Sequence, residues 1–368
     1  MTRAKGGFRR ACVMMLLMGG SVSSAAASTP EVVSFHPDHH PDTAALVSEL
    51  MAQGLSQEWL YDVLARTFYR QEVLDAMEGA AERRLVWHEY RNIFLKDERI
   101  EQGADFMRLH LPTLERATEQ YGVPAEIITA IIGVETYYGR FKGKHPVLDS
   151  LATLGFHHPT RGRFFRGELA AMLKIAYEQG VDPAELRGSY AGAMGYPQFI
   201  PTSYQAYAVD FDQDGIRDLW NNPIDAIGSV ANYFAEHKWQ AGEPVYQQAE
   251  GPPSPPETLE FNQSSTPTLT LNEVMEAGIT PQGQGAENFM SDPERRVVPL
   301  YLDISEDVQD YRLGGFNFYV IMRYNHSHLY AMAVTELAQA IAEKAAVEDI
   351  STLEGTRSDT MASEKDIQ

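Results

Sequence analysis

One carboxylate stands in a stretch of sequence that otherwise has the character of a buried helix. Residues 127–139, IITAIIGVETYYG, are rich in isoleucine, and Glu135 is the charged residue among them. From Ile128 the apolar residues recur at the i, i+3, i+4 spacing of one helix face, and Glu135 follows at i+7. A carboxyl group against apolar surface loses hydration of its charged form, which raises its pKa and lets it donate a proton near neutral pH. The pattern therefore indicates a candidate general acid.

A simpler interpretation of Glu135 is also open. The helix could end just before Gly139, and the carboxylate could then reach water or pair with Arg140. Periodicity alone does not choose between these two interpretations.

An acidic loop is the second candidate site. In DFDQDGIRDLWNN, which begins at Asp210, the residues Asp210, Asp212 and Asp214 occupy loop positions 1, 3 and 5, and Gly215 occupies position 6. Oxygen ligands at alternating positions and a glycine at the sharp turn are typical of a calcium loop. Position 12 is Asn221, where a bidentate Glu is expected, so a solvated acidic turn is the alternative.

Two other segments resemble known functional motifs, but their neighbouring residues do not fit those motifs. The glycines of AGAMG (191–195) follow no strand and precede no Lys-Ser/Thr pair, which argues against a phosphate-binding loop. Ser189 is not a nucleophile of the Gly-x-Ser-x-Gly type, because Arg187 and Ala191 stand where that motif has glycines.

The elements that must position these residues are mainly helical. Apolar residues recur at helical spacing through a predicted helical domain, and turns marked by Gly and Pro divide the predicted catalytic core. RRVVPLYLDI (295–304) and FNFYVIM (316–322) have the composition of strands. We therefore predict an α+β protein with a helical domain (28–103), a core (104–240), a Pro-rich linker and small inserted β-rich domain (241–322), a return to the core (323–348) and a disordered tail (349–368).

The N-terminus indicates export. Four basic residues, Arg3, Lys5, Arg9 and Arg10, precede an apolar run, Ala11 to Val22, and three alanines at 25–27 follow as a cleavage pattern. We expect residues 1–27 to be a cleaved signal peptide; an uncleaved membrane anchor is the alternative, although the run is short for one. Cys12 lies at the start of the apolar run and not after it, so we expect a soluble, exported protein of the periplasm and not a lipoprotein.

Charge limits the possible partners. The chain carries a formal charge of −21, and removal of residues 1–27 would take away four positive charges, giving −25. Such a charge disfavours binding to nucleic acid or to anionic lipid. Cys12 is the one cysteine, so the mature chain is expected to contain no disulfide.

Several long segments resemble the lytic murein transglycosylase B family. They are YGVPAEIITAIIGVETYYGRFKGKHPVLDSLATLGF, GSYAGAMGYPQFIPTSYQAYAVDFDQDGIRDLW, NPIDAIGSVANYF and RYNHSHLYAMAV, spread over residues 85–340. The resemblance implies a lysozyme-like core and cleavage of the β-1,4 bond between N-acetylmuramic acid and N-acetylglucosamine in peptidoglycan strands. It also implies that the muramic 6-hydroxyl attacks its own anomeric carbon, so that one Glu acts first as acid and then as base and no cofactor takes part in catalysis.

The resemblance also assigns residues. Ser189 and Gln198 match polar residues of the active site. Arg161 matches one member of an arginine pair whose other member is Thr160 here, and Tyr137 and Tyr138 replace an Arg-Trp pair. Residues matching the substrate groove are Tyr90, Tyr233, Tyr324, Asn325 and Tyr330.

For the acidic loop, the resemblance implies a structural calcium ion. The matching ligands are Asp210, Asp212, Asp214, the carbonyl of Ile216 and a later Asp225, with Asp218 as a water-mediated contact. Two other functions stay open at this stage: a non-catalytic peptidoglycan-binding protein, and a lysozyme-type hydrolase with a second carboxylate across the groove.

Overall fold

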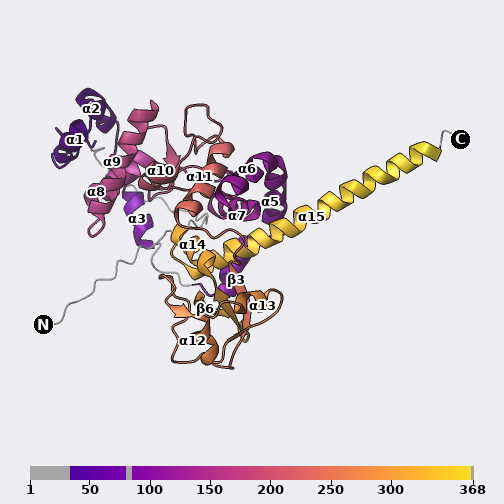
Figure 1. Ribbon diagram of the computed structural model, residues 1–368. Helices are drawn as coiled ribbons and strands as arrows, with labels where there is room; N and C mark the ends of the chain where they lie inside the picture. The colour runs from indigo at the N-terminus through magenta and orange to yellow at the C-terminus, as the bar shows by residue number, and fades with distance from the viewer. Residues whose placement is uncertain (1–33, 80–84, 366–368) are drawn as a thin grey trace, which may run out of the picture. The chain divides into compact units, whose positions relative to one another are not determined.

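The computed structural model describes residues 34–79 and 85–365, with side chains as far as Val347 (Figure 1). The predicted signal peptide and Cys12 lie outside these residues. The described chain divides into two compact units. The first unit contains residues 85–138 and 230–365, and the second unit contains residues 34–79 and 139–229.

The first unit combines a group of helices with a small antiparallel sheet. Its elements are α4 (Trp87–Phe94), α5 (Asp97–Leu109), α6 (Leu111–Tyr121), α7 (Ala125–Thr136), the end of α11 (Pro223–Glu236), β3 (Tyr246–Glu250), β4 (Leu269–Thr270), α12 (Leu271–Glu276), β5 (Thr280–Pro281), α13 (Ala286–Met290), β6 (Arg296–Asp303), β7 (Gln309–Gly314), α14 (Phe316–Tyr324) and α15 (His328–Lys365). Helix α7 packs against α5, α6 and α15. Ile128, Ile131 and Ile132 are fully buried, as their spacing predicts.

The sheet of the first unit has the strand order β4-β6-β7-β3-β5, and all its pairings are antiparallel. In the register of β6 and β7, Tyr301 lies opposite Tyr311. One face is covered by α12 and α13 through an apolar cluster that includes Leu271, Val274 and Phe289. The strands of this sheet lie within residues 241–322, and β6 confirms the strand expected at 295–304.

The prediction of a strand at 316–322 is wrong, because these residues form α14. The segment follows Gly314 and Gly315, and its buried residues Asn317, Phe318, Val320, Ile321 and Met322 cover more than alternate positions. The aromatic and β-branched residues of this segment are buried as part of a helix. Their packing outweighs the weak strand propensity of these residue types.

The last helix also differs from expectation. The backbone of α15 continues past Asp349, where the sequence predicts disorder, to Lys365. Among the side chains that the structure describes in α15, which end at Val347, the last buried one is Ala345. The sequence beyond contains one glycine and no proline, which leaves it compatible with a helix that extends from the packed part (Figure 1).

The second unit is helical with one short strand pair. Its elements are α1 (Thr43–Ala52), α2 (Gln57–Ala65), α3 (Gln71–Gly79), β1 (His145–Pro146), α8 (Val147–His157), α9 (Gly162–Gln179), β2 (Arg187–Gly188), α10 (Pro201–Tyr207) and the first part of α11. Helices α8 and α9 pack on each other, and α9 also contacts α1 and α10.

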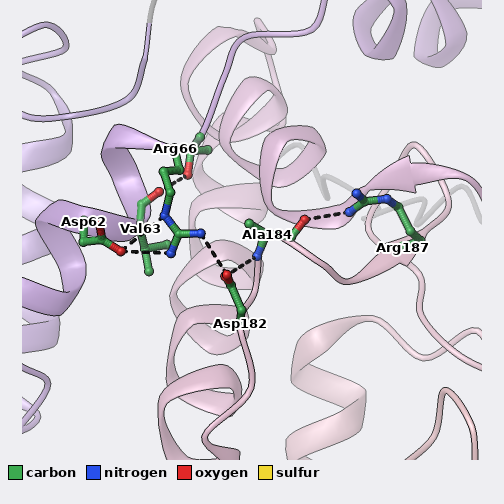
Figure 2. Close-up of polar contacts among 7 residues, drawn as sticks. Asp62, Val63, Arg66, Asp182, Ala184 and Arg187 are labelled. Carbon is green, nitrogen blue, oxygen red and sulfur yellow. Dashed lines mark hydrogen bonds and ion pairs between the residues drawn. The ribbon is translucent and has the colours of Figure 1, made fainter.

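Two arginines connect the N-terminal helices of the second unit to the rest of it. Arg70 forms an ion pair of 2.7 Å with the buried carboxylate of Asp149 in α8. Arg66, after α2, bonds both Asp62 and Asp182, and Figure 2 shows its guanidinium between the two carboxylates. Among the described residues, none of the helices is both long and apolar enough to cross a membrane.

Candidate active site

Glu135 lies in the last turn of α7, and its side chain is half-buried. Pro124 stands immediately before the helix, where its fixed φ and missing N–H are tolerated. The buried isoleucines hold α7 in the first unit, and the same periodicity carries Glu135 toward the interior. The local sequence therefore determines the face of α7 on which this carboxylate lies.

The backbone after Glu135 leaves the helix through two left-handed residues. Tyr137 and Tyr138 have φ values of 53° and 60°, a conformation that is costly for residues other than glycine. Tyr138 donates a hydrogen bond of 2.8 Å to the carbonyl of Arg99 in α5. Arg99 in turn donates to the carbonyl of Gly133 at 3.2 Å, and its guanidinium lies 4.6 Å from the centre of the Tyr137 ring. Contacts to α5 thus hold the end of α7 in place.

The carboxyl group of Glu135 has a specific hydrogen-bond partner in α15. Tyr330 of α15 donates a hydrogen bond of 2.6 Å to its Oε1, and Tyr330 is itself buried. Burial raises the pKa of Glu135 to about 7, and the Tyr330 hydrogen bond opposes this rise. Burial and the nearby Glu135 also raise the pKa of Tyr330 well above its ordinary value. Near neutral pH Glu135 can therefore exchange a proton while Tyr330 stays a donor.

Aromatic rings continue from Tyr330 through the first unit. Tyr324 stacks on Tyr330 at 6.4 Å between ring centres, and Tyr233 meets Tyr324 edge to face at 4.7 Å. The buried Tyr90 interacts electrostatically with Tyr330 and packs on Phe94. The first unit thus contains Glu135 together with all four tyrosines predicted as groove residues. Asn325 lies directly after Tyr324, at the end of α14.

Ser189 and Gln198 belong to the second unit, in the loops between β2 and α10. The buried Ser189 hydroxyl oxygen accepts from the backbone N–H of Ala191 at 3.2 Å and of Ala193 at 2.9 Å. Because its oxygen is used twice as an acceptor, its O–H is free to donate. This hydroxyl is oriented as a hydrogen-bond donor by its own loop.

The side chain of Gln198 is oriented as a hydrogen-bond acceptor, in contrast to Ser189. Its side-chain N–H₂ donates to the carbonyl of Gly195 at 2.8 Å and to that of Lys142 at 3.3 Å, so its carbonyl oxygen stays available as an acceptor. Its φ is 50°, a strained value for glutamine that is typical of functional positions. Ser189 and Gln198 therefore offer one donor and one acceptor.

Arg161 stands at the start of α9 in the second unit. Its guanidinium lies 5.1 Å from the ring centre of Phe164 and 4.9 Å from that of Phe165. These contacts hold the cation against aromatic surface, while the neighbouring Thr160 carries no charge.

The acidic loop has the geometry of a cation site. Asp210, Asp212 and Asp214 place carboxylate oxygens within 4.8 Å of one another. The loop turns through Gln213 and Gly215, which have φ values of 66° and 95°. Asp210 accepts the N–H groups of Asp214 and Gly215, which curls the loop around its own carboxylate. Three converging carboxylates repel one another unless a cation lies between them, so these residues fit Ca²⁺.

Asp225 plays a different part from the three convergent aspartates. It is fully buried, and its two oxygens accept the N–H groups of Phe211 at 2.7 Å and Asp218 at 2.8 Å. Burial raises the pKa of its carboxyl group. Asp225 thus fastens both ends of the loop to α11, and each oxygen keeps a second lone pair for a cation. Asp218 caps the following turn by accepting from Trp220 and Asn221, and Ile216 is exposed.

Two residues of the Glu135 region were not predicted from the sequence. Arg99 holds the end of α7, and His237 stacks on Tyr233 at 4.1 Å between ring centres. His237 follows Tyr233 at the i+4 spacing of neighbours on a helix, a signal that could have found it. Arg99 contacts Gly133 across 34 residues, and no local pattern predicts such a contact.

Comparison with known proteins gives a consistent result. The family model described as "Transglycosylase SLT domain" matches residues 38–339. The curated "Membrane-bound lytic murein transglycosylase B" of Escherichia coli (strain K12) is 40% identical over 315 residues, which are 83% of each chain.

Solved structures are similar over the same part of the chain. Catenated lytic transglycosylase SltB1 from Pseudomonas aeruginosa is 45% identical with a TM-score of 0.78, covering 83% of this chain and 98% of that one. Escherichia coli Slt35, solved in complex with calcium, is 38% identical with a TM-score of 0.76, covering 85% and 97%. SltB3 from Pseudomonas aeruginosa, solved in complex with NAG-anhNAM-pentapeptide, is 31% identical with a TM-score of 0.69, covering 82% and 79%.

Proposed function

Because the chain belongs to the transglycosylase SLT family and is a lytic transglycosylase with a lysozyme-like fold, we propose that it cleaves murein with Glu135 as its acid and base. The bond is the β-1,4 link between N-acetylmuramic acid and N-acetylglucosamine, and the product carries a 1,6-anhydromuramic end. SltB3 structures with NAG-anhNAM-pentapeptide and NAG-NAM-pentapeptide support both the substrate and the anhydro product.

The single observation that carries this mechanism is the partly buried Glu135, whose pKa burial raises to about 7. In its neutral form, Glu135 protonates the oxygen of the leaving N-acetylglucosamine as the glycosidic bond breaks. The carboxylate then takes the proton from the muramic 6-hydroxyl, whose oxygen closes on the anomeric carbon. The proton given in the first step is regained in the second, so Glu135 ends the cycle as it began.

Tyr330 has the role of holding this carboxyl group in place. Its hydroxyl donates to Oε1 of Glu135, which leaves the other oxygen to carry and exchange the proton. The raised pKa of Tyr330 keeps it protonated throughout the cycle. Tyr90, Tyr233, Tyr324 and Asn325 belong to the same unit, and we assign them to sugar binding.

Ser189 and Gln198 are assigned to the N-acetyl group of the muramic residue. The O–H of Ser189 can donate to a carbonyl, and the Gln198 carbonyl oxygen can accept from an amide N–H. Oriented in this way, the N-acetyl oxygen could stabilise the positive charge at the anomeric carbon, a form of substrate assistance. Arg161 can pair with an acidic group of the attached peptide.

Two further features complete the proposal. Asp210, Asp212, Asp214, the Ile216 carbonyl and Asp225 would hold a structural Ca²⁺, which is supported by their convergence and by the calcium complex of Slt35. The basic and apolar N-terminal sequence supports export to the periplasm, where murein lies.

Product analysis tests the proposal against its two alternatives. Digestion of purified murein should release fragments with anhydro ends, each one water lighter than a hydrolysed end by mass spectrometry. Replacing Glu135 by Gln, which keeps the size and the Tyr330 hydrogen bond, should lower the rate at least about 10³-fold. Reducing ends would indicate a hydrolase, and full activity of Glu135→Gln would mean that another group is the acid.

A further inference from the structure

A second surface of the chain has the composition of a sugar-binding site. It is a depression of about 430 Å³ in the second unit, formed by α2, the end of α9 and the turn that follows α9. This volume lies within the range of about 300–1,000 Å³ found for small-molecule sites. None of the residues assigned to catalysis or to the groove lines it.

Two aromatic side chains form one wall of this depression. Trp59 of α2 and Tyr177 of α9 meet edge to face, with 5.1 Å between ring centres and 69° between ring planes. Tyr177 is 40% exposed, so part of this side chain is accessible to a ligand. Two rings at this angle form a corner, with the face of one ring beside the edge of the other. The C–H face of a pyranose ring fits against such an aromatic surface.

The polar groups around the corner have unused hydrogen-bonding capacity. Within the described part of the chain, no residue bonds the Trp59 indole N–H or the Tyr177 hydroxyl. Three of the five N–H groups of Arg66 bind Asp62 and Asp182, which leaves two for a ligand. Asp182 is held by Arg66 and by the Ala184 N–H, and its side chain is 38% exposed (Figure 2). Donors and acceptors at fixed positions beside aromatic faces are what sugar hydroxyl and N-acetyl groups require.

The backbone beside the rings leaves room for a polymer. Gly180 ends α9 with φ 66°, and a side chain added there would meet nothing within 4 Å. Gly180 therefore adds no side chain beside the rings, and no neighbouring atom lies where a side chain would project.

We propose that this depression, lined by Trp59, Tyr177, Arg66 and Asp182, binds a stretch of the murein glycan that is not being cleaved. The inference rests on the proposed function for the identity of the polymer. Such a site would hold the enzyme on an insoluble substrate between cleavage events, because a second contact raises the effective concentration of the first.

The test uses the full chain with Glu135→Gln, so that the polymer stays intact, and measures cosedimentation with purified murein sacculi. Adding Tyr177→Ala should weaken binding about tenfold, whereas Tyr177→Phe should bind within about twofold of its parent because the ring is kept. Leu109→Ala, which removes an exposed apolar residue of the first unit, is the matched control and should bind as the parent does. Trp59→Ala is a second variant, and thermal unfolding of each variant shows that it is folded.

Two results would overturn the inference. Binding of folded Tyr177→Ala and Trp59→Ala equal to that of the parent would mean that the depression binds no glycan. Weaker binding to sacculi but unchanged binding to strands stripped of peptides by an amidase would make it a peptide site.

A cleavage assay is the second measurement. With Glu135 restored, Tyr177→Ala should cleave short soluble fragments at the parent rate while losing activity on sacculi. Absence of anhydro products from the parent would refute the proposed function alone, since binding to sacculi is measured separately.

Discussion

At Glu135 the needs of folding and of catalysis oppose each other. The isoleucine stripe of α7 stabilises the first unit by burial, whereas the carboxylate at its end loses hydration when it ionises. The hydrogen bond from Tyr330 offsets part of this cost but leaves the pKa near 7. The chain thus keeps a residue that lowers its stability at high pH and that supplies the proton its chemistry needs.

Glu135→Gln should therefore raise stability in a pH-dependent way. The pKa of Glu135 is about 7 in the folded chain and 4.5 in its ordinary state, so the folded form binds more protons between these values and stability falls as pH rises through them. Gln lacks this penalty, which reaches about 3 kcal/mol above pH 7. Urea unfolding of both proteins should give similar stabilities at pH 4 and a clear advantage for the variant at pH 8. An equal difference at both values would show that ionisation is not the cause.

Tyr330→Phe should move the pH dependence of cleavage. Because the Tyr330 hydrogen bond lowers the pKa of Glu135, its loss should raise that pKa and shift the alkaline decline of kcat to higher pH. The rate at the optimum should fall about tenfold, since the carboxyl group is less well oriented. Tyr301→Phe, in the sheet of the same unit, is the control and should leave the profile unchanged. An unshifted profile for Tyr330→Phe would show that this hydrogen bond does not lower the pKa of Glu135.

At the scale of elements, the end of α7 is held by tertiary contacts in an unfavourable backbone conformation. Two consecutive left-handed tyrosines cost roughly 1–3 kcal/mol each. The ring of Tyr138 folds back over Gly133, where an added Cβ would lie 2.6–2.7 Å from its atoms. This glycine permits the close approach that fixes the turn after Glu135.

Gly133→Ala and Gly167→Ala should consequently have opposite effects. Alanine in a helix is ordinarily favoured over glycine by about 1 kcal/mol. At Gly167, on the exposed side of α9, an added Cβ meets nothing within 4 Å, so that gain should appear. At Gly133 the clash with Tyr138 should reverse the sign and cost about 1–3 kcal/mol. Urea midpoints measure both changes; stabilisation by Gly133→Ala would show that the turn adapts freely.

Calcium binding by the acidic loop can be tested at the same scale. Added Ca²⁺ at about 100 times its Kd should stabilise the chain by about 2.7 kcal/mol, and a chelator should reverse the rise in Tm. Asp212→Asn should remove most of this shift, because it takes one carboxylate from the convergent group. Asp307→Asn, an exposed acidic residue elsewhere, should keep it. A Tm that does not respond to Ca²⁺ would leave the loop as a solvated acidic turn.

At the scale of the whole molecule, composition and family agree on the kind of partner. A formal charge of −21 disfavours binding to phosphate polymers, and a relative that is 40% identical to the chain is named a lytic murein transglycosylase. The first compact unit contains Glu135 with its tyrosines, and the second contains Ser189, Gln198 and the acidic loop. The proposed glycan site on the second unit would add affinity for the polymer without altering the acid.

The sequence by itself determined the features whose cause is local. The period of α7 places Glu135 beside its isoleucines, and the three loop aspartates converge because five residues contain them all. Only the tertiary structure decided the rest. Tyr330 reaches Glu135 across 195 positions, Arg99 reaches Gly133 across 34, and residues 316–322 form a helix because packing outweighs their strand propensity. Contacts of this kind depend on how distant elements meet in the folded chain, and no short window of sequence contains that information.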